Sequence, residues 1–263
     1  MTIKMLYSCL GIMLLCAGVS MAQAGQVSVA VASNFLSTLR DLAPLFEEKT
    51  GHQLKVSFGS TGRLYSQIEN GAPFEVFMAA DEQRPARAEA QGLAVTGSRF
   101  TYGLGQLVLW SPKENLFNSE SETKAYLQAG DFSRLAVANP KTAPYGVAAQ
   151  QVLESMGLWS RYSRMLVRGD SIAQAFQFTA TANANLGFVS FSQLKSWQAE
   201  PGSLWFIPQT YYQPIRQQVV LLKKGKDNAA ALAFMVFLQS PAARALIADY
   251  GYGRVPLAPD VRK

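Results

Sequence analysis

Four short segments of this chain place polar side chains at the expected start of a helix. They are Ser33-Asn34, Gly59-Ser60-Thr61-Gly62, Ala143-Pro144-Tyr145-Gly146 and Asp170-Ser171-Ile172. The first turn of a helix carries backbone N–H groups without intrahelical partners, and the helix dipole adds partial positive charge, so such a terminus can bind an anion. One such segment is more simply explained by helix capping, and its glycines by a plain turn. Four of them in one chain indicate a binding site.

Residues for metal or nucleophilic chemistry are scarce. The only histidine, His52, follows a glycine predicted to end a helix and is expected at the surface, and the only cysteines are Cys9 and Cys16. The sequence contains no G-x-S-x-G, H-E-x-x-H or Walker A motif, and Gly103-Leu104-Gly105 lacks the third glycine of a dinucleotide fingerprint. We therefore predict no enzyme and no cofactor, although paired carboxylates are not excluded by sequence.

The N-terminus has the pattern of an export signal. Lys4 precedes the apolar run Leu6–Val19, and Ala22-Gln23-Ala24 gives an A-x-A cleavage site. We predict a signal peptide over residues 1–24, cleavage after Ala24 and a periplasmic mature protein. A membrane anchor is the alternative, but the run is short for a span of about 20 residues. The mature chain would contain no cysteine, so its fold would depend on its core alone.

Charge excludes one class of partner. The chain has 24 Lys and Arg against 18 Asp and Glu, a net charge of +6, and its basic residues are scattered. A nucleic-acid-binding protein more often concentrates them in one stripe. We therefore expect no nucleic-acid partner.

Strand and helix patterns alternate along the chain. Repeated βαβ units predict an α/β fold, with mostly parallel sheets and helices on both faces. We predict two lobes, residues 25–104 plus 222–263 and residues 105–221. Pro44 should kink or break the first helix. Strands are predicted at 27–32, 54–58, 74–79, 135–138, 165–167, 186–189 and 218–222, and helices at 35–50, 63–70, 145–156, 171–179, 227–238 and 241–250.

Several motifs together carry a family resemblance over essentially the whole mature chain. They are Ala32-Ser-Asn-Phe35, Phe58-Gly-Ser-Thr-Gly-Arg-Leu-Tyr65, Gln67-Ile-Glu-Asn-Gly-Ala-Pro73, Phe77-Met-Ala-Ala-Asp81, Gly97-Ser-Arg-Phe-Thr-Tyr-Gly103, Leu107-Val-Leu-Trp110, Asn139-Pro140 with Ala143-Pro-Tyr-Gly146, and Leu186-Gly-Phe-Val189. The chain resembles the periplasmic molybdate-binding proteins of ABC transporters. The resemblance implies the two-lobed type II binding-protein fold, with the anion held between the lobes.

The resemblance also implies a set of anion contacts. Matched motif by motif, they are Ser33, Asn34, Thr61, Tyr145 and Ile172, the last two through their backbone N–H groups. Ser60 and Ser171 are further candidates. Ser190 stands where one branch of the family has a tyrosine, so Asn34 carries more weight. No side chain is expected to bind molybdenum directly.

The implied mechanism is binding without catalysis. Neutral N–H and O–H donors would surround a dehydrated molybdate or tungstate dianion, with no lysine or arginine required in contact. Hydrogen phosphate carries its own donor and would need an acceptor, so such a site disfavours it. The expected partner is the inner-membrane permease, and the protein is expected to be a monomer. The alternatives are a binding protein for another oxyanion such as sulfate, or a periplasmic hydrolase.

Overall fold

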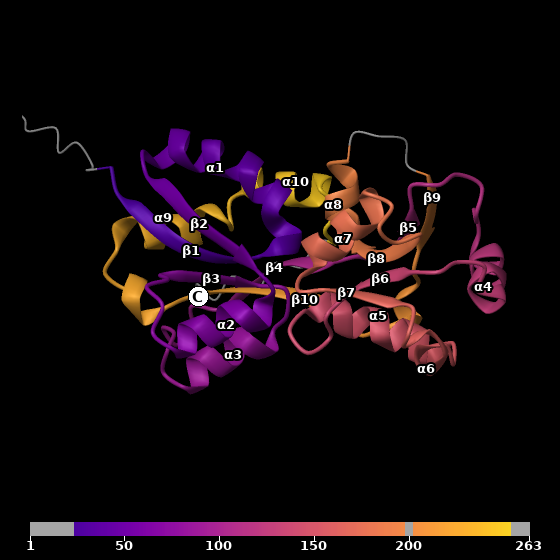
Figure 1. The fold of residues 1–263 in the computed structure, drawn as a ribbon. Helices are drawn as coiled ribbons and strands as arrows, with labels where there is room; N and C mark the ends of the chain where they lie inside the picture. Colours follow the sequence, from indigo (N-terminus) through magenta and orange to yellow (C-terminus); the bar gives the residue numbers. More distant parts are fainter. Residues whose placement is uncertain (1–23, 198–201, 254–263) are drawn as a thin grey trace, which may run out of the picture.

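Two five-stranded sheets, each flanked by helices, form two lobes lying side by side (Figure 1). The computed structural model describes residues 24–197 and 202–253. The predicted signal peptide therefore lies outside the described residues, apart from Ala24. The predicted two-lobed α/β architecture is confirmed.

The first sheet has the strand order β2-β1-β3-β10-β4. β1 is parallel to β2 and β3, whereas β10 is antiparallel to β3 and β4. The sheet is therefore mixed. The strand that returns from the other lobe, β10, runs opposite to both of its neighbours. The elements of this lobe are β1 (Gln26–Ala32), η1 (Ser33–Phe35), α1 (Leu36–Thr50), β2 (Gln53–Gly59), α2 (Thr61–Glu69), β3 (Val76–Ala79), α3 (Gln83–Ala90), β4 (Phe100–Gly105), β10 (Ile215–Leu221), η3 (Lys223–Gly225), α9 (Ala229–Phe237) and α10 (Pro241–Asp249).

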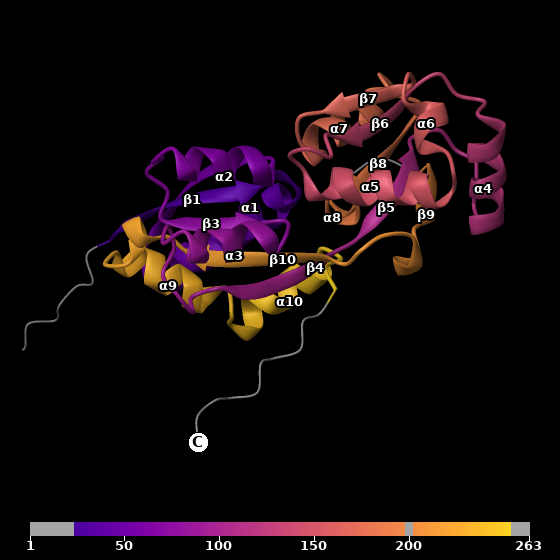
Figure 2. The ribbon, with the colours of Figure 1, turned by 90° about the horizontal axis from the view of Figure 1, so that it is seen from below.

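Side-chain alternation along β1 builds a core on each face of the first sheet. Val27, Val29 and Val31 pack with α1, α9 and α10, whereas Ala30 packs with α2 and α3. Successive side chains of a strand point to opposite faces, so a strand buried on both sides is apolar throughout. Figure 2 shows α2 and α3 on the face opposite α9 and α10.

The second sheet has the order β7-β6-β8-β5-β9 and the same mixture of strand directions. Its elements are β5 (Leu107–Ser111), α4 (Glu120–Ala129), β6 (Leu135–Ala138), α5 (Pro144–Ser155), α6 (Trp159–Tyr162), β7 (Leu166–Gly169), α7 (Ile172–Ala180), β8 (Leu186–Ser190), α8 (Phe191–Lys195), β9 (Ser203–Phe206) and η2 (Gln209–Tyr211).

The chain crosses between the sheets twice. β4 ends at Gly105 and β5 begins at Leu107, close to the predicted crossing. The return lies between Phe206 and Ile215, since β10 is hydrogen-bonded to β3 and β4 of the first sheet. The prediction that the second lobe extends to residue 221 is therefore wrong for β10. A local apolar run identifies a strand without indicating which sheet it joins.

Two local predictions can be compared with the structure. α1 runs without a break through Pro44 to Thr50, so Pro44 does not end the helix, and Gly51, with a φ of 71°, caps it. His52, expected at the surface, is only 8% exposed, and its Nδ1 accepts a hydrogen bond of 2.9 Å from the Gly25 N–H.

In the described part of the chain no single helix is long and apolar enough to cross a membrane; α9 and α10 meet the criteria of length and composition only as a pair bent by 61°.

Candidate functional site

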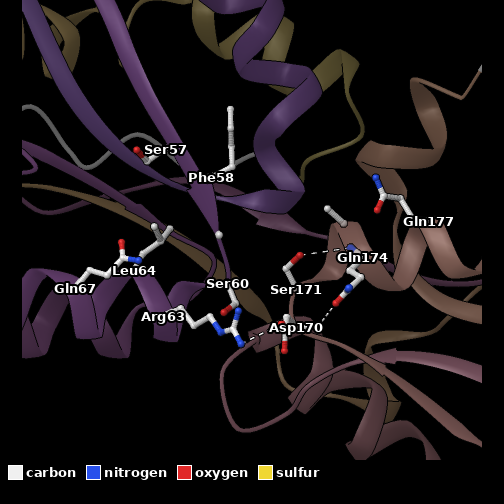
Figure 3. A pocket seen from close by; sticks show the side chains of 12 residues that line it. Ser57, Phe58, Ser60, Arg63, Leu64, Gln67, Asp170, Ser171, Gln174 and Gln177 are labelled. Atoms are coloured by element: carbon white, nitrogen blue, oxygen red, sulfur yellow. Dashed lines mark hydrogen bonds and ion pairs between the residues drawn. The ribbon is translucent and has the colours of Figure 1, made fainter. Parts of the chain in front are cut away.

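The four segments singled out by sequence come together where the lobes meet. From the first lobe, η1 and the start of α2 face the second lobe. The Ala173 N–H at the start of α7 donates to Ser33 Oγ at 3.5 Å, and the Gly62 N–H in α2 donates to the Thr142 carbonyl, just before α5, at 2.8 Å. A groove of about 500 Å³ lies between α2 and α7, with Ser60 and Ser171 on opposite walls (Figure 3).

Backbone donors line the meeting point. Thr61 and Ile172 are the first residues of α2 and α7, and Tyr145 is the second residue of α5. N–H groups at these positions have no carbonyl acceptor within their own helix. Three of the five predicted contacts thus lie in the first turns of helices from both lobes, where an anion is stabilised.

Hydroxyl groups accompany these N–H groups. Thr61 Oγ1 accepts a hydrogen bond of 3.0 Å from the Ala80 N–H, which fixes the side chain and leaves its own hydrogen to donate. Ser33 Oγ likewise accepts from Ala173 and can donate. Ser60 Oγ and Thr142 Oγ1 are buried without a hydrogen-bond partner. Such orphaned hydroxyls are rare because an unpaired buried polar group is costly, which fits a ligand that pairs with them.

Ser171 acts first as a helix cap. Its Oγ accepts a hydrogen bond from the Gln174 N–H at 3.4 Å at the start of α7. The capping role suggested by sequence is thus present, and it leaves the hydroxyl hydrogen available toward the groove.

The Asn34 side chain is held by other protein groups. It is 1% exposed, and its Nδ2 donates to Gln217 Oε1 at 2.8 Å and to the Tyr252 hydroxyl at 3.0 Å. Both amide hydrogens are therefore used, while Oδ1 is buried without a partner. In this arrangement Asn34 offers a bound anion no side-chain donor.

Ser190 lies one step behind the site. It is fully buried, its Oγ donates to Gln193 Oε1 at 2.9 Å, and it lies 3.1 Å from Ser192 Oγ. Ser192 Oγ in turn donates to the Asn34 carbonyl at 3.0 Å. Ser190 therefore lies beside Ser192, which supports the η1 backbone.

The cationic groups near the groove are paired with carboxylates. Arg63 lines the groove and forms an ion pair of 2.9 Å with Asp170 of the other lobe. Arg84, beside Gly62, pairs with Asp81, whose pKa is raised by burial and lowered in part by Arg84 itself. Among the described residues no group of three or more His, Cys, Asp or Glu could hold a metal ion.

Sequence reasoning missed the residues that connect the predicted contacts. Tyr102, Tyr252 and Gln217 form the buried network around Asn34, and Arg63 spans the groove. The one available signal was the polar pair Gln217-Gln218 ahead of an apolar strand run. Pairing across 183 residues, as between Asn34 and Gln217, leaves no local pattern.

Comparisons with known proteins match nearly all of the described part of this chain. Residues 27–253 match the family model for bacterial extracellular solute-binding proteins. The chain is 52% identical to the molybdate-binding protein ModA of Azotobacter vinelandii over 88% of this chain and 91% of that protein, and 46% identical to ModA of Rhodobacter capsulatus over 88% and 89%. The structure of the periplasmic molybdate-binding protein of A. vinelandii superimposes with a TM-score of 0.82 at 42% identity, covering 88% of this chain and 99% of that one.

Proposed function

Because this chain belongs to the bacterial extracellular solute-binding proteins, we propose that it captures molybdate in the periplasm for an ABC importer. Its ModA relatives are named for molybdate binding. They are transport proteins, so this chain is a binding protein and not an enzyme. Molybdate is its transported ligand rather than a cofactor, and tungstate, which has the same charge and shape, is expected to bind as well.

The observation that carries the proposal is the convergence of helix N-termini from both lobes. Thr61 belongs to the first lobe and Tyr145 and Ile172 to the second, so one anion would contact both at once. In this proposal the first lobe comprises residues 25–105 and 215–253, and the second residues 107–206.

The binding groups are neutral donors. The N–H groups of Thr61, Tyr145 and Ile172 and the hydroxyls of Ser33 and Thr61 would replace the hydration shell of the dianion. Hydrogen bonds to a charged acceptor are about twice as strong as neutral ones, which offsets the lost hydration. Ser60 and Ser171 would add hydroxyl donors from the groove walls, whereas Ser190 would lie behind Ser192 without touching the anion.

The selectivity of the site for molybdate would follow from its hydrogen-bond donors and from the size of its cavity. A site without acceptors leaves the proton of hydrogen phosphate unpaired and so disfavours it. Sulfate matches molybdate in charge but is smaller, so a cavity fitted to molybdate would hold it with longer, weaker hydrogen bonds. Closure of the lobes would then create the form that the membrane permease recognises. We propose that the protein acts as a monomer and that residues 1–24 are removed on export.

Titration calorimetry of the mature protein tests the proposal. We expect tight molybdate binding that excess sulfate does not displace. Tight sulfate binding with no heat from molybdate would favour the sulfate alternative and reject this proposal.

A further inference from the structure

One buried amide joins both halves of the candidate site. Gln217 lies on β10 with no exposed surface. Its Oε1 accepts hydrogen bonds from Asn34 Nδ2 at 2.8 Å and from the Tyr102 hydroxyl at 2.9 Å, both in the first lobe. Its Nε2 donates to the Tyr145 hydroxyl of the second lobe at 3.0 Å. Gln217 is therefore in direct contact with two of the five predicted anion contacts, Asn34 and Tyr145.

The surrounding backbone is shaped to admit this amide. A Cβ atom on Gly105 would lie 2.6 Å from Gln217 Nε2 and would overlap the Tyr145 hydroxyl. The pairing of β10 with β4 also shifts register between Gln217 and Gln218. A β-bulge of this kind re-aims a side chain, here between the lobes.

The side-chain amides of Asn34 and Gln217 can form the network in two orientations, which reverse the direction of the hydrogen bonds. In the observed direction Asn34 donates to Gln217, Gln217 donates to Tyr145, and Asn34 Oδ1 is left buried with nothing to accept. If both amides turn over, Gln217 Nε2 donates to Asn34 Oδ1 and to the Tyr102 hydroxyl, which keeps its bond to the Ala79 carbonyl. The Tyr145 hydroxyl then donates to Gln217 Oε1.

The second direction changes what Asn34 presents to a ligand. Its Oδ1 then accepts from Gln217 Nε2 and from the Tyr252 hydroxyl, whose hydrogen turns away from the Asn34 carbonyl; Ser192 Oγ still donates to that carbonyl. The Asn34 Nδ2 takes the place of the orphaned oxygen. In the proposed site Asn34 is an anion contact, so an acceptor at that place would repel the anion, whereas N–H donors would bind it. An anion therefore selects the second direction.

We propose that Gln217 is a positioning residue that sets which end of the Asn34 amide faces the anion and couples this choice to Tyr145 across the lobes. The inference rests on the proposed oxyanion site. It explains how an asparagine whose donors are used within the protein can still serve as an anion contact.

Three buried tyrosines belong to the Asn34–Gln217 network, and Asp81 and Tyr212 act on Tyr102 and Tyr145 electrostatically. Burial raises the pKa of Tyr102 and Tyr145 well above the ordinary value and that of Tyr252 to about 12. Each therefore remains a neutral hydroxyl at neutral pH, able to donate or accept, as both directions require.

A pair of matched substitutions tests the role. Gln217→Met removes the coupling amide, and Gln218→Met makes the same change one residue along the strand. Gln218 is 7% exposed, and its side chain bonds Arg99 and Thr101 of the first lobe. We expect molybdate binding by calorimetry to weaken about 10- to 100-fold in Gln217→Met, the effect of losing one donor to a charged group, and to stay near the unmodified value in Gln218→Met.

The pH dependence of molybdate binding by Gln217→Glu distinguishes the proposed positioning role from a purely structural one. A carboxylate can only accept, so it holds Asn34 in the direction that turns Oδ1 toward the anion; a protonated carboxyl can donate and restores the other direction. Burial raises the pKa of such a carboxyl. The molybdate affinity of Gln217→Glu should therefore increase as pH falls from 8 to 6, while that of the unmodified protein stays level.

The outcomes separate this inference from the proposed function. If the unmodified protein does not bind molybdate, the proposed function fails, and this inference with it. If it binds and both methionine variants bind equally well, only the role of Gln217 is refuted. Should Gln217→Met not fold, a level pH profile for Gln217→Glu refutes it instead.

Discussion

The lobes contact each other through two very different regions. On the hinge side, Asn34, Gln217, Tyr145 and Tyr252 form a buried, uncharged network. On the groove side, the Arg63–Asp170 ion pair joins side chains that are 58% and 57% exposed. Breaking a buried hydrogen bond leaves unpaired polar groups in a low-dielectric interior, whereas an exposed ion pair exchanges readily for water. The hinge side is thus suited to hold donors in fixed positions, and the groove side to open and close.

On the groove side, the close backbone contact between Gly62 and Thr142 should matter more for molybdate affinity than the Arg63–Asp170 ion pair. A Cβ on Gly62 would lie 2.9 Å from the Thr142 carbonyl oxygen and 3.0 Å from its Cα. Gly62→Val should therefore keep the lobes apart and weaken molybdate binding about 100-fold or more, as expected when two hydrogen bonds to an anion are lost. Calorimetry would measure this, and thermal unfolding without ligand should change little.

Gly59→Val is the matched control within the same loop. The three atoms nearest to a Cβ there all belong to the Leu64 side chain of the first lobe, at 3.2–3.8 Å. Neither glycine has a positive φ, so neither variant introduces backbone strain. Equal affinity of the two variants would contradict the role of the Gly62–Thr142 contact.

Loss of individual donors should have an intermediate effect. Thr61→Ala and Asn34→Ala should each weaken molybdate binding by roughly 1–3 kcal/mol, the cost of losing a donor to a charged group. Thr61→Ser keeps the hydroxyl and should bind nearly as well as the unmodified protein. Unchanged affinity in both alanine variants would refute the assigned contacts.

The exposed ion pair should contribute least among the side chains. Arg63→Gln should weaken molybdate binding at most about fivefold, less at high salt, because exposed pairs contribute little and are screened. Arg87→Gln removes an ion pair of 3.0 Å with Glu69 inside the first lobe, with Arg87 60% exposed, and serves as control. A loss of 100-fold in Arg63→Gln would mean that its guanidinium contacts the anion.

The pH should have almost no effect on the molybdate affinity of the unmodified protein. The tyrosines of the hinge network have raised pKa values, with Tyr252 at about 12, so they stay protonated well into the alkaline range. The dissociation constant measured by calorimetry should be level from pH 6 to pH 9. A tenfold change across that range would reveal a titrating group among the contacts.

Local sequence patterns predicted the parts of the site that depend on helix starts. Ser60 and Ser171 do occupy N-cap positions, and Thr61 and Ile172 begin α2 and α7. Helix starts of this kind can be predicted locally. An N-cap residue with extended backbone comes directly before an amphipathic run, and both can be recognised within a few residues.

Long-range pairing accounts for what the sequence did not reveal. β10 was placed in the wrong lobe because an apolar run carries no information about its partner strands. β4 was overlooked because Gly103 and Gly105 weaken its strand pattern; the space beside Gly105 is filled by Tyr145 and Gln217. The hinge network was likewise hidden, since its members come from four distant parts of the chain.

A crystal structure of the mature protein with molybdate tests the central claim most directly. We expect molybdate oxygens about 2.7–3.2 Å from the backbone nitrogens of Thr61, Tyr145 and Ile172, with the Ser33 and Thr61 hydroxyls also in contact and no lysine or arginine touching the anion. A guanidinium of Arg63 or Arg84 bound directly to molybdate would contradict it.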